Sequence, residues 1–451
     1  MDDASAPYIR IEPPGPKARE LIKLDEENIM QSFTRWYPLV VKTAYGSIVE
    51  DVDGNRYIDF NSGLVVVNVG HRHPRVVEAI KKQVDKLIHY SLTDFYYEEA
   101  ARAALRLKKI APIGDGKVFF TNSGAESIEA AIKISRGYYK SSRPYILSFI
   151  GGFHGRTYGA MSVSASKPVH RRGFSPLLPG IIHIPYPNPY RCPFAAETPS
   201  ECSDGVIGFM EEYIFKHVVD PVEVSAIIFE PIQGEGGYVV PPDDFFWKLE
   251  KLVKPHGILM VDDEIQAGFG RTGKWFAIEH WGVEPDLVAV AKGIASGLPL
   301  GAVVGKRHLM TLPRGSHANT FGGNPVALAA FNAVVDIIIS ENLLEKALRD
   351  GEYIMRRLNE LAEEVELIGD IRGKGLMIGV ELVKDRDTKE PAVNETSAVI
   401  QESFKKGLLV VAAGYSTIRI APPLTIERDL IDKGLEILEE SLKAVGRVNN
   451  R

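Results

Sequence analysis

Two residues that could do chemistry together, Asp263 and Lys292, each lie just beyond the end of a short apolar run. Asp263 follows residues 258–261 at an interval of two, and Lys292 follows residues 287–291. Runs of this kind are typical of strands buried on both faces. An acid and an amine at such strand ends could hold and activate a flat, charged cofactor, and a desolvated lysine could act as a Schiff-base nucleophile. Judged alone, Lys292 could equally be a surface lysine that caps a turn.

Three further groups follow predicted strands in the same way. They are Ser123-Gly124-Ala125 after residues 118–121, Phe153-His154 after residues 145–150, and Glu230 after residues 225–229. In open parallel sheets, ligands bind beyond the carboxyl ends of the strands. One such residue would mean little, but five elements at one sheet edge predict a binding site.

Each of these groups allows two interpretations. Ser123 and Gly124 open a predicted helix over residues 125–139, whose first N–H groups could hold a phosphate, or Ser123 only caps that helix. Phe153 could lie flat on an aromatic ring or simply belong to the core. Glu230, at the end of a buried strand, would place a carboxyl group in the predicted binding site.

Asp263 and Glu235 are also open to two interpretations. Asp263 belongs to the run Asp262-Asp263-Glu264, which could be a solvated face or a metal site. A carboxylate directed into a sheet-edge pocket could instead keep a pyridinium nitrogen protonated. Glu235 could join Glu230 in the pocket or lie in solvent.

A glycine cluster between the two central residues resembles nucleotide-binding motifs but lacks their context. GFGRTG, at 268–273, matches G-x-G-x-x-G, yet it does not follow its strand directly and a long helix does not follow it. Residues 268–274 also match the start of a P-loop, but Trp275 stands where a magnesium-binding Ser or Thr is required. We therefore interpret the cluster as a connection.

The elements that must position these residues form two domains in our prediction. Seven strand-length apolar runs, separated by helices or long loops, indicate an α/β domain whose mostly parallel sheet is covered by helices. The runs lie at 118–121, 145–150, 181–184, 225–229, 258–261, 287–291 and 302–304. We expect residues 71–325 to form this large domain, residues 326–451 a smaller α+β domain, and residues 1–70 an N-terminal arm and hairpin belonging to the small domain.

Composition restricts the class of protein. The chain has 451 residues, 45% of them hydrophobic, and a net charge of −6, which argues against a nucleic-acid binder. The N-terminus resembles neither a signal peptide nor a membrane helix. The two cysteines, Cys192 and Cys202, could bridge, but a reduced cytoplasmic protein is favoured. His71 and His73 lack a third metal ligand at suitable spacing, so we expect no metal site.

Several motifs, taken in order, resemble the class III aminotransferases, which are pyridoxal-phosphate enzymes of fold type I. The resemblance covers nearly the whole chain after the N-terminal arm. The motifs are DVDGNRYIDF, VGHRHP, TNSGAES, GFHGRT, EPIQGEGG, VDDEIQAGFGRTGKW, AKGIASGLPLGA, NTFGGNP and RIAPPL.

This resemblance implies a pyridoxal 5′-phosphate site and gives each residue a role. Lys292 would form the internal aldimine, Asp263 would contact the pyridine nitrogen, and Gln266 would lie near the phenolic oxygen. The remaining cofactor-binding residues would be Ser123, Gly124 and Ala125 at the phosphate, Phe153 and Ile265 on the ring faces, His154, Glu230, and Thr320 from a second subunit. A homodimer with shared active sites follows from the last assignment.

The same resemblance suggests the substrate. Arg419 matches an arginine that binds a carboxylate of glutamate or 2-oxoglutarate, and Glu235 matches the acid that pairs with it when the other substrate is bound. Arg156 matches a second carboxylate-binding arginine of enzymes that act on 4-aminobutyrate or ornithine. Leu64 would help to shape the substrate pocket.

Three hypotheses follow. The first, which the sequence favours, is an aminotransferase that moves an amino group from an ω-amino acid to 2-oxoglutarate. The second is an amino-acid racemase or epimerase on the same scaffold, which shares Lys292, Asp263 and Gln266. The third is a cofactor- or nucleotide-binding protein without catalytic activity.

Overall fold

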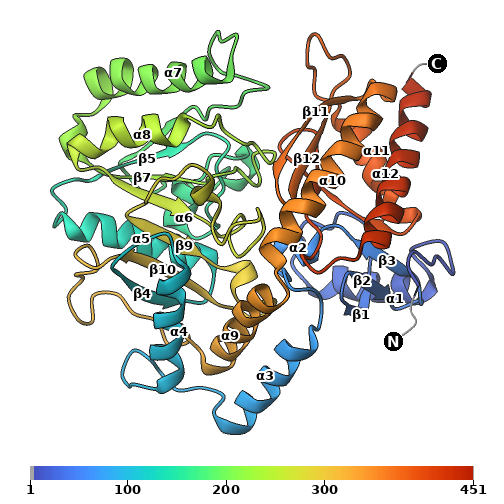
Figure 1. Ribbon diagram of the computed structural model, residues 1–451, viewed down its shortest axis with the longest axis horizontal. Coiled ribbons are helices and arrows are strands. Elements are labelled where there is room, and N and C mark those ends of the chain that lie inside the picture. The colour runs from blue at the N-terminus through green and yellow to red at the C-terminus, as the bar shows by residue number, and fades with distance from the viewer. Residues whose placement is uncertain (1–4, 450–451) are drawn as a thin grey trace. The chain divides into compact units, whose positions relative to one another are not determined.

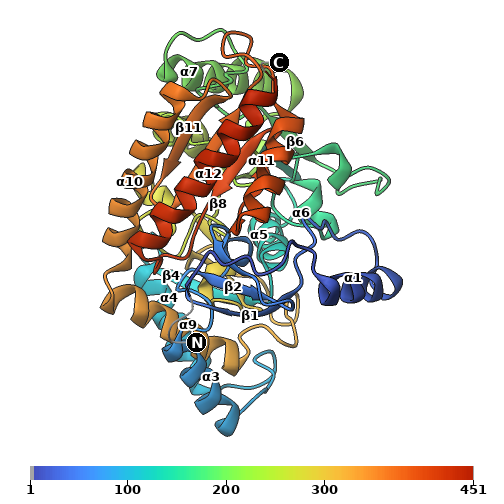
Figure 2. The same cartoon turned by 90° about the vertical axis from the view of Figure 1, so that its right-hand side faces the viewer.

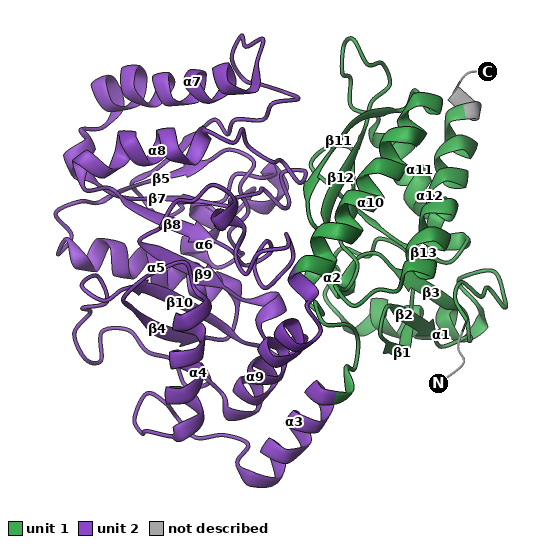
Figure 3. Cartoon of the chain, viewed as in Figure 1, with its two compact units in different colours: residues 1–74, 345–451 green, residues 75–344 purple. Residues whose placement is uncertain are grey.

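The computed structural model describes residues 5–449, and the chain divides into two compact units (Figure 3). Unit 1 joins Met1–Pro74 to Glu345–Arg451, and unit 2 is Arg75–Leu344. Helix α9 (Pro325–Ser340), which we had assigned to the C-terminal domain, packs against α4 (Glu98–Ile110) and belongs to unit 2.

Unit 2 is built on the predicted sheet of seven strands, in the order β4-β10-β9-β8-β7-β5-β6 (Figure 1). Strand β10 is antiparallel to both of its neighbours, whereas β9, β8, β7, β5 and β6 pair in parallel. The mostly parallel sheet predicted from the apolar runs is therefore confirmed. The strands are β4 (Gly116–Thr121), β5 (Tyr145–Phe149), β6 (Ile181–Ile184), β7 (Val224–Phe229), β8 (Leu259–Asp263), β9 (Leu287–Val290) and β10 (Gly301–Lys306).

Helices cover both faces of this sheet because its central strands are apolar on both sides. On one face, α5 (Gly124–Tyr138) packs through Ile128 onto a core that contains Ile228 of β7. On the other face, α8 (Phe245–Val253) places the Phe246 ring 4.8 Å from that of Phe229. The other helices of this unit are α3 (Pro74–Lys86), α6 (Tyr158–Ser162) and α7 (Pro199–Phe209), together with α4 and α9.

The segment between β6 and β7 corrects one expectation from the sequence. It contains α7, which begins with a capping box at Thr198 and continues into a π-helical segment, Met210–Val218. Cys192 and Cys202 form a disulfide, and their Cα atoms lie 5.9 Å apart. The preference for reduced cysteines was wrong because it rested on composition, whereas the chain turns back before α7 and brings the two residues together.

Unit 1 contains two four-stranded sheets, ordered β1-β2-β3-β13 and β11-β12-β15-β14. A hairpin joins β2 to β3, and β3 pairs in parallel with β13, so the first sheet combines strands from the N-terminal and C-terminal parts of unit 1. The strands are β1 (Val41–Tyr45), β2 (Ile48–Asp51), β3 (Arg56–Asp59), β11 (Ile368–Lys374), β12 (Met377–Leu382), β13 (Leu408–Leu409), β14 (Val411–Ala413) and β15 (Thr417–Ile420).

The helices of unit 1 are α1 (Pro16–Asn28), α2 (Ser62–Val65), α10 (Leu343–Glu364), α11 (Val393–Lys405) and α12 (Arg428–Asn449). Helices α11 and α12 lie side by side (Figure 2). In residues 5–449, no single helix has the length and apolar composition needed to cross a membrane; α9 and α10 pass that test only as a pair, with a bend of 66° between them.

Candidate active site

The carboxyl ends of β5, β7, β8 and β9 lie next to one another in unit 2, as the order of the strands requires. Asp263 is the last residue of β8, and it pairs in register with Ala289 of β9. Glu230 follows β7 directly, and Lys292 comes two residues after β9. The structure thus brings together the acid, the amine and the second acid that the sequence placed at one sheet edge.

Asp263 is held by a buried histidine. Its Oδ2 atom lies 2.6 Å from Nδ1 of His154, and its Oδ1 atom accepts a hydrogen bond from the Ile265 N–H at 3.0 Å. Burial lowers the pKa of His154, but the hydrogen bond and charge of Asp263 outweigh it, so that the pKa is raised overall. Since both side chains are buried, the pair fixes the position of the Asp263 carboxylate.

Glu230 connects the loops that follow β5 and β7. Its Oε2 atom accepts from the Phe153 N–H at 2.9 Å, and its Oε1 atom accepts from the Gly234 N–H at 3.0 Å. Burial raises the pKa of Glu230 to about 7, the His154 charge opposes this rise, and the Asp263 charge adds to it. Glu230 is therefore an acid of this edge that titrates near neutral pH.

Asp262 and Glu264 are buried residues of the same run, and they alternate with Asp263 along β8 and its extension. Burial raises the pKa of Asp262 well above its usual range and that of Glu264 to about 8. Glu264 Oε1 accepts from the Ile278 N–H at 2.8 Å. The solvated-face interpretation of the acidic run is wrong, because the strand that carries it lies in the middle of the sheet.

The backbone at Lys292 is strained. Lys292 has φ of +46°, in the left-handed region that residues other than glycine rarely adopt, and it opens a short 3-10 turn, Lys292–Ile294. Its side chain is partly buried. Strain of this kind persists only where surrounding structure enforces it, and it is common at functional sites.

The predicted phosphate loop meets the loops after β5 and β8. A Cβ atom on Gly124 would lie 2.8 Å from Cδ1 of Ile265, so only glycine permits this approach. A Cβ atom on Gly155 would lie 2.7 Å from that of Ala125. Ser123 accepts from the Glu126 N–H at 3.2 Å and so caps α5, which leaves the first N–H groups of the helix for another acceptor.

Pyridoxal phosphate, which the sequence resemblance implies, fits these residues. The start of α5 offers N–H donors and a positive dipole to a phosphate. The Asp263 carboxylate suits a protonated ring nitrogen. The Oε1 atom of Gln266 is buried and has no hydrogen-bond partner within residues 5–449. A bound ligand could supply a hydrogen bond to this amide.

A charged cluster surrounds Phe153. The Arg156 guanidinium carbon lies 5.5 Å from the centre of the Phe153 ring, and the His170 ring meets the same ring edge-on at 5.4 Å. Lys167 Nζ donates to Glu235 Oε1 at 2.7 Å. Burial lowers the pKa of His170, as do the Arg156 and Lys167 charges, whereas the Glu235 charge raises it. Lys167 and His170 were missed from the sequence, because they lie outside any motif and after the strand-end loop.

Three predicted residues belong to other elements. Thr320 is exposed in the loop of unit 2 between β10 and α9. Arg419 and Leu64 belong to unit 1: Arg419 is buried on β15, in register with Gly379 of β12, and Leu64 is exposed within α2, where it has φ of +72°. The glycine cluster at 268–273 is buried and is followed by a short 3-10 turn, Ala277–His280, as expected of a connection.

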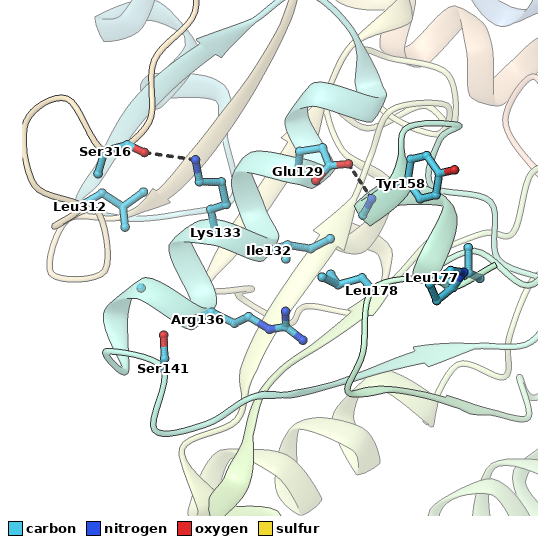
Figure 4. Close-up of a pocket in the computed structure, with 13 residues that line it drawn as sticks. Glu129, Ile132, Lys133, Arg136, Ser141, Tyr158, Leu177, Leu178, Leu312 and Ser316 are labelled. Atoms are coloured by element: carbon cyan, nitrogen blue, oxygen red, sulfur yellow. Dashed lines mark hydrogen bonds between the residues drawn. The ribbon is translucent and has the colours of Figure 1, made fainter. Parts of the chain in front are cut away.

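A separate pocket of 560 Å³ lies along α5 (Figure 4). Its polar groups support neighbouring backbone: Glu129 Oε1 accepts from the Gly159 N–H at 2.8 Å, and Arg136 donates to the carbonyls of Pro144 and Pro179. None of the five strand-end groups lines this pocket. We therefore assign the polar residues of this pocket a structural role in holding α6. We do not assign the pocket to the chemistry of the sheet edge.

Comparison with known proteins agrees with this geometry. Residues 30–442 match the family model for aminotransferase class-III. The chain is 44% identical over 443 residues to an alanine/serine racemase of Pyrococcus horikoshii, which covers 97% of this chain and 93% of that one. It is 40% identical over 403 residues to a probable 4-aminobutyrate aminotransferase of Bacillus subtilis, covering 88% and 92%. An (S)-enantioselective omega-transaminase from Thermomicrobium roseum superposes with a TM-score of 0.88 at 34% identity, covering 95% and 99%.

Proposed function

Because this chain belongs to the class III aminotransferase family, a family of pyridoxal-phosphate enzymes of fold type I, we propose that it racemises or epimerises a neutral amino acid. Membership of this enzyme family argues against the hypothesis of a binding protein without catalytic activity. What remains to be assigned is the reaction and the substrate.

Each strand-end residue has a role in this proposal. Pyridoxal phosphate, when bound, supplies an electron sink for the α carbon of the substrate. Asp263, held by His154, keeps a proton on the ring nitrogen of the cofactor. Ser123, Gly124 and Ala125 bind the phosphate.

Proton transfer at the α carbon is assigned to Lys292. Its Nζ atom would hold the cofactor and would accept the proton of the substrate α carbon. In a racemase a second acid or a water molecule would deliver a proton to the opposite face of that carbon, while Lys292 would keep the proton that it removed and later release it to solvent. The L- and D-forms then interconvert, and no second substrate is consumed.

The identity of 44% with the alanine/serine racemase, over 97% of this chain, carries the choice of reaction. It exceeds the 40% shared with the probable 4-aminobutyrate aminotransferase, and the matched region is longer. The two substrates in the racemase's name are small, neutral amino acids, which suggests the substrate class for this chain.

The second candidate is the aminotransferase that we favoured from the sequence, with an ω-amino acid as donor and 2-oxoglutarate as acceptor. Three charged residues support it, namely Arg156, Glu235 and Arg419, each of which resembles a carboxylate-binding or carboxylate-pairing residue of such enzymes. The distinction lies in the co-substrate, because transamination stops without a keto acid.

The deciding experiment incubates the purified holoenzyme with single L-amino acids or with 4-aminobutyrate, each with and without 2-oxoglutarate, separates the products on a chiral column and measures the glutamate formed. We expect D-alanine or another neutral D-amino acid to form at a turnover rate without keto acid. If D-amino acid is absent and glutamate forms from 4-aminobutyrate or ornithine plus 2-oxoglutarate, the enzyme is an aminotransferase instead.

Assembly and location also belong to the proposal. We propose a homodimer in which the partner subunit donates Thr320 to the phosphate site, and the exposure of Thr320 supports this arrangement. A cytoplasmic location stays a prediction, and the disulfide removes one of its grounds.

A further inference from the structure

The pocket along α5 combines an apolar wall with two cationic side chains (Figure 4). Its volume of 560 Å³ lies within the range of about 300–1,000 Å³ that is usual for small-molecule sites. The apolar side chains come from α5, from the segment before β6 and from the loop after β10: Ile132, Pro176, Leu177, Leu178 and Leu312. Such a wall can bury the hydrocarbon part of a ligand.

Arg136 brings a positive charge to this pocket, and its side chain extends from α5 toward Leu178 (Figure 4). Its Nη2 atom donates to the Pro144 carbonyl at 2.6 Å and to the Pro179 carbonyl at 2.8 Å, and its buried Nε atom has no hydrogen-bond partner within residues 5–449. Burial lowers the pKa of Arg136, but a guanidinium in a protein stays protonated. Arg136 is therefore a partly buried cation whose partners are carbonyl groups and not carboxylates.

Lys133 lies one turn before Arg136 on α5 and adds a second positive charge to the lining. Its Nζ atom donates to the Ser316 carbonyl at 3.2 Å and to Nδ1 of His317 at 2.9 Å. Burial and the Lys133 charge lower the pKa of His317, and the charges of Glu129 and Glu126 oppose them only in part. A neutral His317 accepts from Lys133 but does not balance its charge.

Glu129 is the only acid among the described residues that line the pocket. Its Oε1 atom accepts from Thr157 Oγ1 at 2.6 Å and from the N–H groups of Gly159 and Ala160 at 2.8 and 3.2 Å. These donors lie at the start of α6, where the helix dipole favours a carboxylate. Because Glu129 is held by α6, the lining presents two cations against one acid that is already bound.

We propose that this pocket is a second ligand site, which binds a monocarboxylate with an apolar tail. The carboxylate pairs with the Arg136 guanidinium, and the tail packs on the leucine side chains of the wall. A planar guanidinium suits a carboxylate, and the excess of one positive charge in the lining suits a single negative charge. A cationic ligand with the same tail is repelled. The site is separate from the sheet edge, so the proposal does not depend on the reaction that occurs there.

The first test measures binding of octanoate to the purified holoenzyme by isothermal titration calorimetry. Octylammonium, which carries the same tail and the opposite charge, is the matched ligand. We expect octanoate to bind with a Kd of about 1 mM or lower, and octylammonium to bind at least about tenfold more weakly. Equal affinity for the two ligands, or no binding of octanoate, would overturn the proposal.

The second test removes the charge that the proposal assigns to the carboxylate. Octanoate should bind about tenfold more weakly to Arg136→Met than to the parent protein. The matched control is Arg102→Met, which removes an arginine paired with Glu98 on the exposed face of α4. This control should bind octanoate as the parent protein does. An equal loss in Arg102→Met would overturn the proposal, because a loss of net charge anywhere would then explain the result.

A third variant leaves the charges unchanged, because Arg136 also supports two carbonyl groups and its loss could disturb the fold. Leu312→Trp fills the pocket from the loop after β10 and should weaken octanoate binding at least about tenfold. Unchanged binding in this variant would show that octanoate occupies another place.

NMR of ¹³C-labelled leucine methyl groups locates the ligand without measuring activity. Octanoate should shift the methyl signals of Leu177, Leu178 and Leu312, each assigned from a leucine-to-isoleucine variant. Shifts confined to other leucines would place octanoate elsewhere, the sheet edge included, and would overturn the site. A holoenzyme that shows these shifts but forms no D-amino acid would contradict the proposed function alone.

Discussion

At the scale of single residues, the acids of the sheet edge differ in the partners that hold them. The Oδ2 atom of Asp263 lies 2.6 Å from Nδ1 of His154, whose protonated form is opposite in charge to the carboxylate. Glu230 accepts two backbone N–H groups, but it is buried beside the negative Asp263, and its pKa rises to about 7. The Asp263 carboxylate is thus held by a side chain, whereas the Glu230 carboxyl changes its protonation near neutral pH.

A pH dependence of stability follows from Glu230. The folded protein holds the Glu230 proton more tightly than the unfolded chain, whose carboxyl has a pKa of about 4.5. The resulting stabilisation is complete below about pH 4.5 and is lost as the pH rises to about 7, a change of roughly 3 kcal/mol. In Glu230→Gln we expect this part of the decline to disappear.

Denaturant unfolding at several pH values between about 5 and 8 measures the effect, with the two proteins compared at each pH. Glu212→Gln, a change of an exposed glutamate paired with Lys216 on the π-helical segment, serves as a control that keeps the parent slope. Parallel curves for the parent protein and Glu230→Gln would show that Glu230 is not the titrating group.

Lys292 carries a second prediction at this scale. Replacing it with alanine removes the only amine that we assign to proton transfer, so turnover should fall by about 10²–10⁴-fold or more. The cofactor-supplemented parent protein should show an absorbance band near the visible edge that shifts on addition of an amine. Lys292→Ala should lack that band. The control Lys216→Met, which removes an exposed lysine paired with Glu212, should retain it. A Lys292→Ala protein with full turnover would contradict the assignment.

At the scale of elements, strands could be predicted from the sequence better than the loops between them. The seven apolar runs correspond to strands β4 to β10. A strand that is buried on both faces must be apolar at nearly every position, and a short continuous apolar run is therefore typical of it. The strand-end groups followed from the sheet itself, since parallel strands end at one edge. The register that brings Asp263 beside β9 could be expected on the same ground.

The loops depend on contacts that no local pattern contains. Lys167 meets Glu235 across 68 positions of sequence, and that contact depends on how the turn Pro168–His170 packs on Phe153. The disulfide likewise depends on the chain reversal before α7. Composition alone favoured thiols, which shows that a whole-chain average does not determine a pairing of two residues.

The disulfide leads to a prediction for the segment that precedes β7. It closes a loop between residues ten positions apart, and constraint of the unfolded chain by such a loop is worth about 2–3 kcal/mol. We expect Cys192→Ser/Cys202→Ser to lower the thermal midpoint relative to the parent protein. Mass spectrometry after thiol alkylation checks the bond directly. Alkylation of both cysteines in the parent protein under non-reducing conditions would contradict it.

At the scale of the whole molecule, an apolar surface of unit 2 is the surface that we expect a second copy to cover in the proposed homodimer. Ile88, Tyr90, Phe95, Tyr96 and Phe321 are each about half exposed or more, and Tyr96 is 99% exposed. The His89 ring packs on Phe321, and Thr93 donates to the Asn319 carbonyl at 2.7 Å, so this surface is continuous with the loop of Thr320. Contiguous exposed aromatic residues of this kind mark protein interfaces.

The double variant Tyr96→Ser/Phe321→Ser tests the dimer and the shared site together. Loss of two exposed aromatic anchors should shift the protein toward monomer, as measured by light scattering after size-exclusion chromatography. Because Thr320 would then lack a partner phosphate to bind, affinity for pyridoxal phosphate should fall in step with the dimer fraction. Tyr415→Ser, at an 80% exposed tyrosine of unit 1, should change neither quantity. A variant that remains dimeric would place the interface elsewhere, and a monomer that binds the cofactor as tightly as the parent protein would remove Thr320 from the phosphate site.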